Sequence, residues 1–197
     1  MKVGGVVIEK NDNVSKVNSA VNVCLEQFVN KGLMATTSRD LSRALNLQSA
    51  GMYSYFQNKD DAVIACAETA AKRLEDELIA VAMNNITSPN TMVTKLCEKA
   101  RQLAPMMRFF TQVCATEKYE ERIRPVLSSL TSRYEDYAKR FARELNVSVD
   151  TVLPYVYICI TAITNYMVFQ EDAYVIPQLS LVANKLDSIM ESNCDNK

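Results

Sequence analysis

Apolar side chains recur at helical spacing along most of this sequence. Between Val17 and Phe28 they fall at i, i+4, i+7, i+8 and i+11, which predicts a helix with one buried face. Gly32 follows this run, and glycine suits the left-handed position just beyond the C-terminus of a helix. The first predicted helix therefore ends immediately before Gly32.

A second helix is expected in the stretch TTSRDLSRAL. Thr37 and Asp40 stand three residues apart in it, which is the spacing of a capping box at a helix N-terminus. Leu41 would begin the buried side of this helix. Asn46 then interrupts the pattern, and asparagine tolerates the left-handed backbone that a tight turn requires.

A third, short helix is predicted near 48–55, with Leu47, Met52 and Phe56 on its inner side. Small or polar residues, QSAG, form its outer start. A long helix should follow from 58 to 83, because two aspartates at its beginning favour the positive end of the helix dipole. Two short helices joined by a tight turn, after a longer one, are typical of a helix-turn-helix unit.

The later part of the chain predicts only helices. No glycine follows Gly51, which disfavours glycine-based hairpins, and prolines are spaced like starts of successive helices. Further helices are expected near 91–103, 105–116, 120–145, 149–169 and 177–191. The fold class is therefore all-α with about nine helices: an N-terminal three-helix, helix-turn-helix domain over 1–58, and a larger helical domain over 59–197.

Composition excludes several classes of function. The chain has 197 residues, 48% of them hydrophobic, and a net charge of −1, so it has no global attraction to polyanions. It contains no histidine, which excludes Ser-His-Asp and Cys-His catalytic sites, and its six cysteines form no CxxC pair. We therefore expect no enzyme, no metal site and no cofactor, in a reducing cytoplasmic protein.

A membrane location is not expected. The apolar run MKVGGVV at the N-terminus is too short for a signal peptide. The most apolar later segment, LPYVYICITAITNYMVF, contains tyrosines, threonines and an asparagine, and it is shorter than the roughly 20 residues of a spanning helix.

In a helix-turn-helix unit the start of the second helix meets base edges in the major groove of DNA. Tyr53 and Tyr55 can then point hydroxyls at phosphates, Lys59 starts the next helix as a phosphate ligand, and Arg39 can reach a base edge. The residues expected to contact DNA are Thr37, Ser38, Arg39, Gln48, Ser49, Ala50, Gly51, Tyr53, Tyr55 and Lys59.

Each of these assignments has a structural alternative. Tyr53 and Tyr55 could pack between helices, Lys59 could be a solvated helix start, and Arg39 could pair with a neighbouring surface charge. The region 1–63 holds seven basic and six acidic residues, so it is only weakly basic. We expect binding to depend on geometry and dimer symmetry more than on charge.

Residues 17–63 resemble the DNA-binding domain of the TetR family of transcriptional regulators. The residues that match in order and spacing are Phe28, Gly32, Thr37, Leu41, Met52, Tyr53, Phe56 and Lys59. The chain departs from the family at three positions. Asn46 stands where glycine is common, Gln48 replaces the usual capping residue, and Gly51 replaces a residue that often contacts DNA. The resemblance implies a homodimeric repressor that releases DNA when a small molecule enters its helical body.

An effector pocket is expected where methionines and aromatic residues cluster in the second half of the chain. Apolar side chains would form its wall, and Tyr and Arg would fix the ligand. The alternative is ordinary core packing, with methionine filling gaps. The residues expected to line the pocket are Met107, Phe110, Cys114, Tyr134, Tyr137 and Tyr166.

A dimer interface is expected on the last two helices, which form that interface in the TetR family. Their apolar stripes are also compatible with a core, but isologous dimers are common and match palindromic DNA. The stripe residues are Ile160, Ile163, Met167, Leu179, Val182, Leu186 and Ile189.

The expected function is a ligand-responsive homodimeric repressor. Its expected partners are a palindromic double-stranded operator, a second copy of the chain and a small apolar effector, and no membrane. The alternative is an all-α small-molecule binding or protein-interaction module of the same fold that does not bind an operator specifically; Gln48, Gly51 and the low charge favour it. A cysteine redox switch stays open as an additional property.

Overall fold

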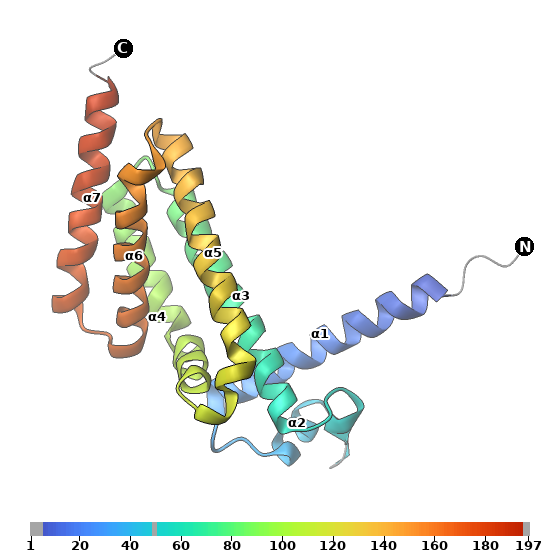
Figure 1. Cartoon of the computed structure of the whole chain (residues 1–197). Helices are drawn as coiled ribbons and strands as arrows, with labels where there is room; N and C mark the ends of the chain where they lie inside the picture. The colour runs from blue at the N-terminus through green and yellow to red at the C-terminus, as the bar shows by residue number, and fades with distance from the viewer. Residues whose placement is uncertain (1–5, 49–50, 195–197) are drawn as a thin grey trace, which may run out of the picture. The chain divides into compact units, whose positions relative to one another are not determined.

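The structure is a computed structural model that describes residues 6–48 and 51–194. Every regular element in these residues is helical (Figure 1). The elements, in chain order, are α1 (Val6–Lys31), α2 (Ser38–Ala44), η1 (Gly51–Ser54), α3 (Lys59–Asn84), α4 (Pro89–Cys114), η2 (Glu117–Tyr119), α5 (Glu120–Leu145), α6 (Val149–Phe169) and α7 (Asp172–Cys194), where η denotes a 3₁₀ helix.

The all-α class is confirmed, but the described residues form seven α-helices where nine were expected. The helices expected at 91–103 and 105–116 are one helix, α4, which runs through Pro105. A proline inside a helix removes one backbone hydrogen bond without always ending the helix. The third expected helix is a 3₁₀ turn over the four residues of η1.

The chain forms two compact units, each made of two separate stretches of sequence. The first unit contains the residues up to Ala70 together with Phe109–Ile123, and the second contains Ala71–Arg108 together with the residues from Arg124 onward. Consequently α3, α4 and α5 each begin in one unit and end in the other.

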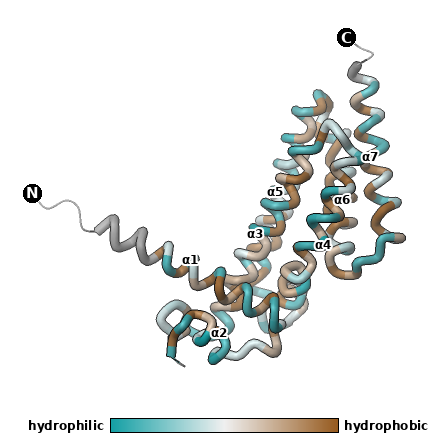
Figure 2. Tube along the Cα trace, turned by 180° about the vertical axis from the view of Figure 1, so that it is seen from behind, coloured by the Kyte–Doolittle hydropathy of each residue, from teal (hydrophilic) through white to brown (hydrophobic). Residues whose placement is uncertain are grey.

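The core of the first unit is built on the predicted apolar face of α1. Cys24, Leu25 and Phe28 are buried there, and the Phe28 ring stacks on the Phe109 ring with centroids 5.3 Å apart. Figure 2 shows how hydrophobic positions recur between hydrophilic ones along the helices. The periodic face predicted for this helix is confirmed as core, although α1 begins at Val6, ahead of the stripe.

In the second unit α6 and α7 lie side by side (Figure 1). By length and composition alone, the 21-residue α6 could cross a membrane. The expectation that the apolar segment in this region is too short to span a membrane was therefore wrong. Its residues Ala162, Ile163, Tyr166 and Met167 are buried within the chain. A helix that buries one face in this way is expected in the core of a helical protein as well.

Candidate nucleic-acid interface

The turn between α1 and α2 is fixed by Gly32. Its φ of +91° lies in the left-handed region, where glycine carries no steric penalty, and its N–H donates to the Phe28 carbonyl at 2.9 Å. Both the N–H and the hydroxyl of the fully buried Thr36 donate to the Gly32 carbonyl, at 3.2 and 2.7 Å. These bonds confirm the predicted end of α1 and direct the chain into α2.

The N-terminus of α2 carries the predicted capping box. The Asp40 N–H donates to Thr37 Oγ1 at 3.2 Å, and the Thr37 N–H donates to Asp40 Oδ2 at 2.8 Å. Lys31 at the end of α1 forms an ion pair with the same carboxylate at 2.6 Å. Hydrogen bonds from Lys31 and Thr37 hold the pKa of Asp40 well below its usual range. The cap therefore joins two helices through one ionised carboxylate.

The C-terminus of α2 ends in a Schellman motif, in which a left-handed residue closes the last turn. Asn46 has φ of +57°, its N–H donates to the Arg43 carbonyl, and the Leu47 N–H donates to the Ser42 carbonyl. The prediction that asparagine adopts the left-handed conformation at this turn is confirmed. The turn of the helix-turn-helix is thus intact without glycine.

A buried hydrogen bond connects α2 to η1. The Met52 N–H donates to Ser42 Oγ at 3.1 Å, and both residues are completely buried. Met52 and Phe56 lie in the core, as predicted. Ser42 was missed, because nothing in the hydrophobic pattern distinguishes a buried serine from an exposed one.

Gly51 is explained by a close approach to Leu47. A Cβ at residue 51 would lie 2.3 Å from the Cβ of Leu47, which is closer than two carbon atoms can pack. Leu47 was expected on the inner side of the third helix, but its side chain is 37% exposed. The chain therefore uses glycine here because a larger residue has no space.

The segment expected to read DNA presents an exposed surface. Tyr53 is 56% exposed, while Tyr55 is half-buried with its ring 6.4 Å from the Phe56 ring. Gln48 is exposed, and Ser49 and Ala50 lie outside the described residues. The exposed Tyr53 side chain can therefore approach a partner, whereas part of the Tyr55 ring packs within the chain.

The remaining residues expected to contact DNA differ in their exposure and in the hydrogen bonds that they already form. Arg39 is exposed and Ser38 half-buried, whereas the Thr37 hydroxyl is bound within the capping box. The Lys59 ammonium donates to the Leu33 carbonyl at 3.2 Å, and burial lowers its pKa. An ammonium has three donors, so this bond leaves Lys59 able to donate further.

The residues expected to form an effector pocket belong to different units. Phe110 and Cys114 lie in the first unit, and the other four, Met107, Tyr134, Tyr137 and Tyr166, lie in the second. Met107, Phe110 and Tyr166 are buried, and Cys114, Tyr134 and Tyr137 are half-buried.

Two of these tyrosines use their hydroxyls within the second unit. Tyr166 donates to Asp172 at 2.7 Å, and Arg101 pairs with that carboxylate at 3.3 Å. Burial and a hydrogen bond to Glu75 raise the pKa of Tyr137. Arg133 holds both oxygens of the buried Glu75, at 2.8 and 2.7 Å.

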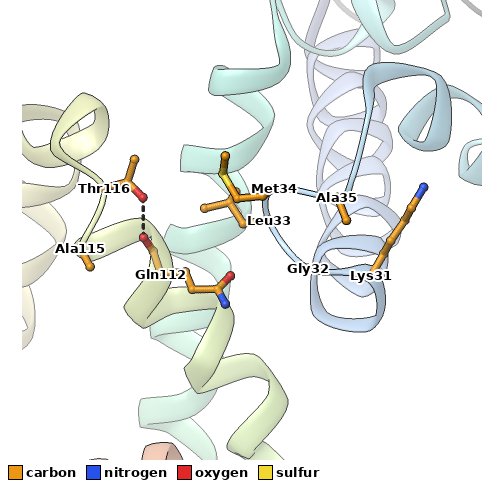
Figure 3. A pocket seen from close by; sticks show the side chains of 8 residues that line it. All are labelled: Lys31, Gly32, Leu33, Met34, Ala35, Gln112, Ala115 and Thr116. Atoms are coloured by element: carbon orange, nitrogen blue, oxygen red, sulfur yellow. Dashed lines mark hydrogen bonds between the residues drawn. The ribbon is translucent and has the colours of Figure 1, made fainter.

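An open hollow of about 500 Å³ lies in the first unit (Figure 3). It is lined by Lys31, Gly32, Leu33, Met34, Ala35, Gln112, Ala115 and Thr116. None of the residues expected to line an effector pocket is among them.

Six of the seven residues expected at the dimer interface are buried within a single chain. Ile163, Met167, Leu179, Val182, Leu186 and Ile189 are each at most 7% exposed, and Ile160 is half-buried. Burial within one chain leaves them almost no surface for a second copy. The large apolar side chains that α6 and α7 do expose are others: Tyr157, Phe169, Tyr174, Ile176 and Leu181.

The cysteines with described side chains are free thiols with raised pKa values. Burial raises the pKa of Cys24 and Cys114 to about 11 and that of Cys159 to about 12. A reactive cysteine needs a lowered pKa, since the thiolate is the reactive form. These sites do not have the electrostatics of a redox sensor.

Comparison with known families identifies the region that contains these turns. Residues 21–66 match the family described as bacterial regulatory proteins, tetR family. The match begins on the buried face of α1, includes α2 and η1, and ends in the first turns of α3. No curated protein matches the chain.

Proposed function

We propose that this protein, a DNA-binding transcriptional regulator with the N-terminal helix-turn-helix domain of the tetR family, is a homodimeric repressor. It would bind a palindromic operator in the cytoplasm and leave it when a small apolar effector binds. In this proposal residues 1–58 form the DNA-binding module, and 59–197 contain the effector site and dimer interface. No catalytic or cofactor chemistry is part of the proposal.

The observation that supports this proposal is the geometry from α2 to η1. Asn46 turns the chain, the Ser42–Met52 hydrogen bond fixes η1 against α2, and Tyr53 is left exposed. In a helix-turn-helix the element after the turn enters the major groove, and the preceding helix lies across the backbone. Arg39 and Tyr53 are the two exposed side chains that we assign to DNA contact.

The proposed dimer uses the exposed apolar residues of α6 and α7. Phe169 is 68% exposed and Leu181 55% exposed, although both are large and apolar. Pairing across a two-fold axis would remove these side chains from water, and it would present two recognition elements to a palindrome. The buried stripe residues would then hold α6 against α7 within each chain.

The proposed effector site lies in the second unit, which contains four of the residues indicated by the sequence: Met107, Tyr134, Tyr137 and Tyr166. Tyr134 and Tyr137 are half-buried near the ion pair of Arg133 and Glu75, so polar groups lie beside apolar surface. Sites for small apolar molecules combine mostly apolar walls with a few such polar groups.

Binding to the DNA upstream of the protein's own gene tests the proposal. Fluorescence anisotropy at two salt concentrations should show tighter binding to this DNA than to a mixed-sequence duplex. Arg39→Ala should weaken the specific complex by ~1–3 kcal/mol if it contacts a base edge. Tyr53→Phe, which removes only a hydroxyl, should weaken it by about 1 kcal/mol.

An all-α binding or interaction module without operator specificity is the second candidate. It is favoured by the 3₁₀ form of η1, because a single turn of four residues presents less surface to the groove than an α-helix. This candidate predicts equal affinity for both duplexes and no effect of either substitution. The same titration therefore separates the two functions.

A further inference from the structure

The short segment between α4 and α5 is fastened to the beginning of α3. The Tyr119 hydroxyl donates to Asp60 Oδ1 at 2.9 Å, and Lys118 Nζ lies 2.7 Å from the same oxygen. Arg122 Nη2 lies 2.8 Å from Asp61 Oδ1. All five residues belong to the first unit, so one compact body contains the whole contact, which we call the charge latch.

The charge latch lies next to the proposed DNA contacts. Asp60 and Asp61 occupy the first turn of α3, six and seven residues after η1 ends at Ser54. Burial lowers the pKa of Lys59, and among nearby charges Asp60 raises that pKa while Lys118 lowers it. Lys118 and Asp60 are therefore both close to the Lys59 ammonium.

Without the latch, this helix start would oppose DNA. Two aspartates stabilise the N-terminus of a helix through its dipole, but their charges repel a phosphate approaching the same end. Lys118 and Arg122 neutralise them, while Asn58 caps α3 independently by accepting from the Asp61 N–H at 2.9 Å. The latch can therefore open without loss of the helix cap.

We propose that Lys118 and Arg122 are positioning residues for DNA binding, which act by neutralising Asp60 and Asp61 at the start of α3. This inference rests on the proposed function. Lys118 lies in η2, between α4 and α5, and Arg122 lies in the first turn of α5.

Stability and binding can be separated in this region. The Lys118 and Arg122 side chains are 59% and 44% exposed, and ion pairs at such exposure contribute little to folding. Charge removal at these two positions should therefore leave the fold intact. Thermal unfolding followed by circular dichroism checks this for every variant.

The test compares charge variants in anisotropy titrations with a mixed-sequence duplex at low salt and with the DNA upstream of the gene. Lys118→Gln with Arg122→Gln should weaken binding to both duplexes about tenfold, and the loss should shrink as salt is raised. Adding Asp60→Asn and Asp61→Asn to this variant should restore affinity to within about twofold of the wild type. Lys99→Gln with Lys139→Gln, which removes two paired cations from the second unit, is the control and should leave affinity unchanged.

The outcomes distinguish the inference from the function on which it rests. A wild-type protein that binds neither duplex contradicts both. If the wild type binds and the Lys118→Gln, Arg122→Gln variant binds equally well, the latch inference is overturned while the regulator function stands. Failure of the aspartate substitutions to restore affinity also overturns it, because the effect would then not come from the uncovered carboxylates.

Discussion

At two positions in the turn region, backbone conformation and steric space determine which residue fits. Asn46 occupies a left-handed conformation, and Gly51 leaves room for the Leu47 side chain. The two positions differ physically: Asn46 is set by a backbone angle, and Gly51 by the close approach of its backbone to the Leu47 side chain. Both determine how η1 follows α2.

Gly51→Ala should destabilise the protein, because the new Cβ would lie 2.3 Å from Leu47 Cβ and 3.0 Å from its Cδ1. A Cβ cannot rotate away, so the backbone of η1 must shift, at a cost of ~1–3 kcal/mol for overpacking. Urea unfolding measures this cost. Ser54→Ala, at an exposed position of the same turn, is the control and should change the unfolding free energy by less than about 0.5 kcal/mol.

At the scale of elements, the features that could be predicted from the sequence are those that depend on neighbouring residues. The end of α1 at Gly32, the capping box of α2 and the left-handed Asn46 each depend on residues within a few positions, and all three predictions are confirmed. The core positions Met52 and Phe56 are also confirmed.

Signals between distant residues could not be predicted. Tyr119 is 59 residues from Asp60, and Arg122 is 61 residues from Asp61, so no periodicity connects them. The division of α4 at Pro105 was wrong because tertiary packing can hold a helix together across a missing hydrogen bond. The stripe residues on α6 and α7 were assigned to a dimer because an apolar stripe has the same spacing whether it is buried in one chain or between two.

The capping box should make the stability of α2 depend on pH. The pKa of Asp40 is lowered by its bonds to Lys31 and Thr37, so its stabilising contribution is present above the unfolded pKa of about 3.9 and is lost as pH falls through the folded value. The difference in Tm between the wild type and Asp40→Asn should therefore be largest above about pH 5 and should decline on acidification. Glu26→Gln, an exposed carboxylate on α1, is the control; an Asp40→Asn difference that is constant with pH would contradict the assignment.

At the scale of the whole molecule, the proposed function requires two copies of the chain. Phe169→Asp with Leu181→Asp places charges on the exposed apolar face of α6 and α7, and it should weaken self-association by ~2 kcal/mol or more, about thirtyfold. Light scattering over a concentration series measures the mass. Met34→Lys changes an exposed apolar residue of the first unit and should leave the mass unchanged; an equal effect of both changes would place the interface elsewhere.

The most direct test of the central claim is the anisotropy titration of the wild-type protein and Arg39→Ala with the DNA upstream of the gene and with a mixed-sequence duplex. The account predicts that the wild type prefers the upstream DNA, and that Arg39→Ala loses most of this preference. Equal binding of the wild type to both duplexes, unchanged by Arg39→Ala, would contradict it.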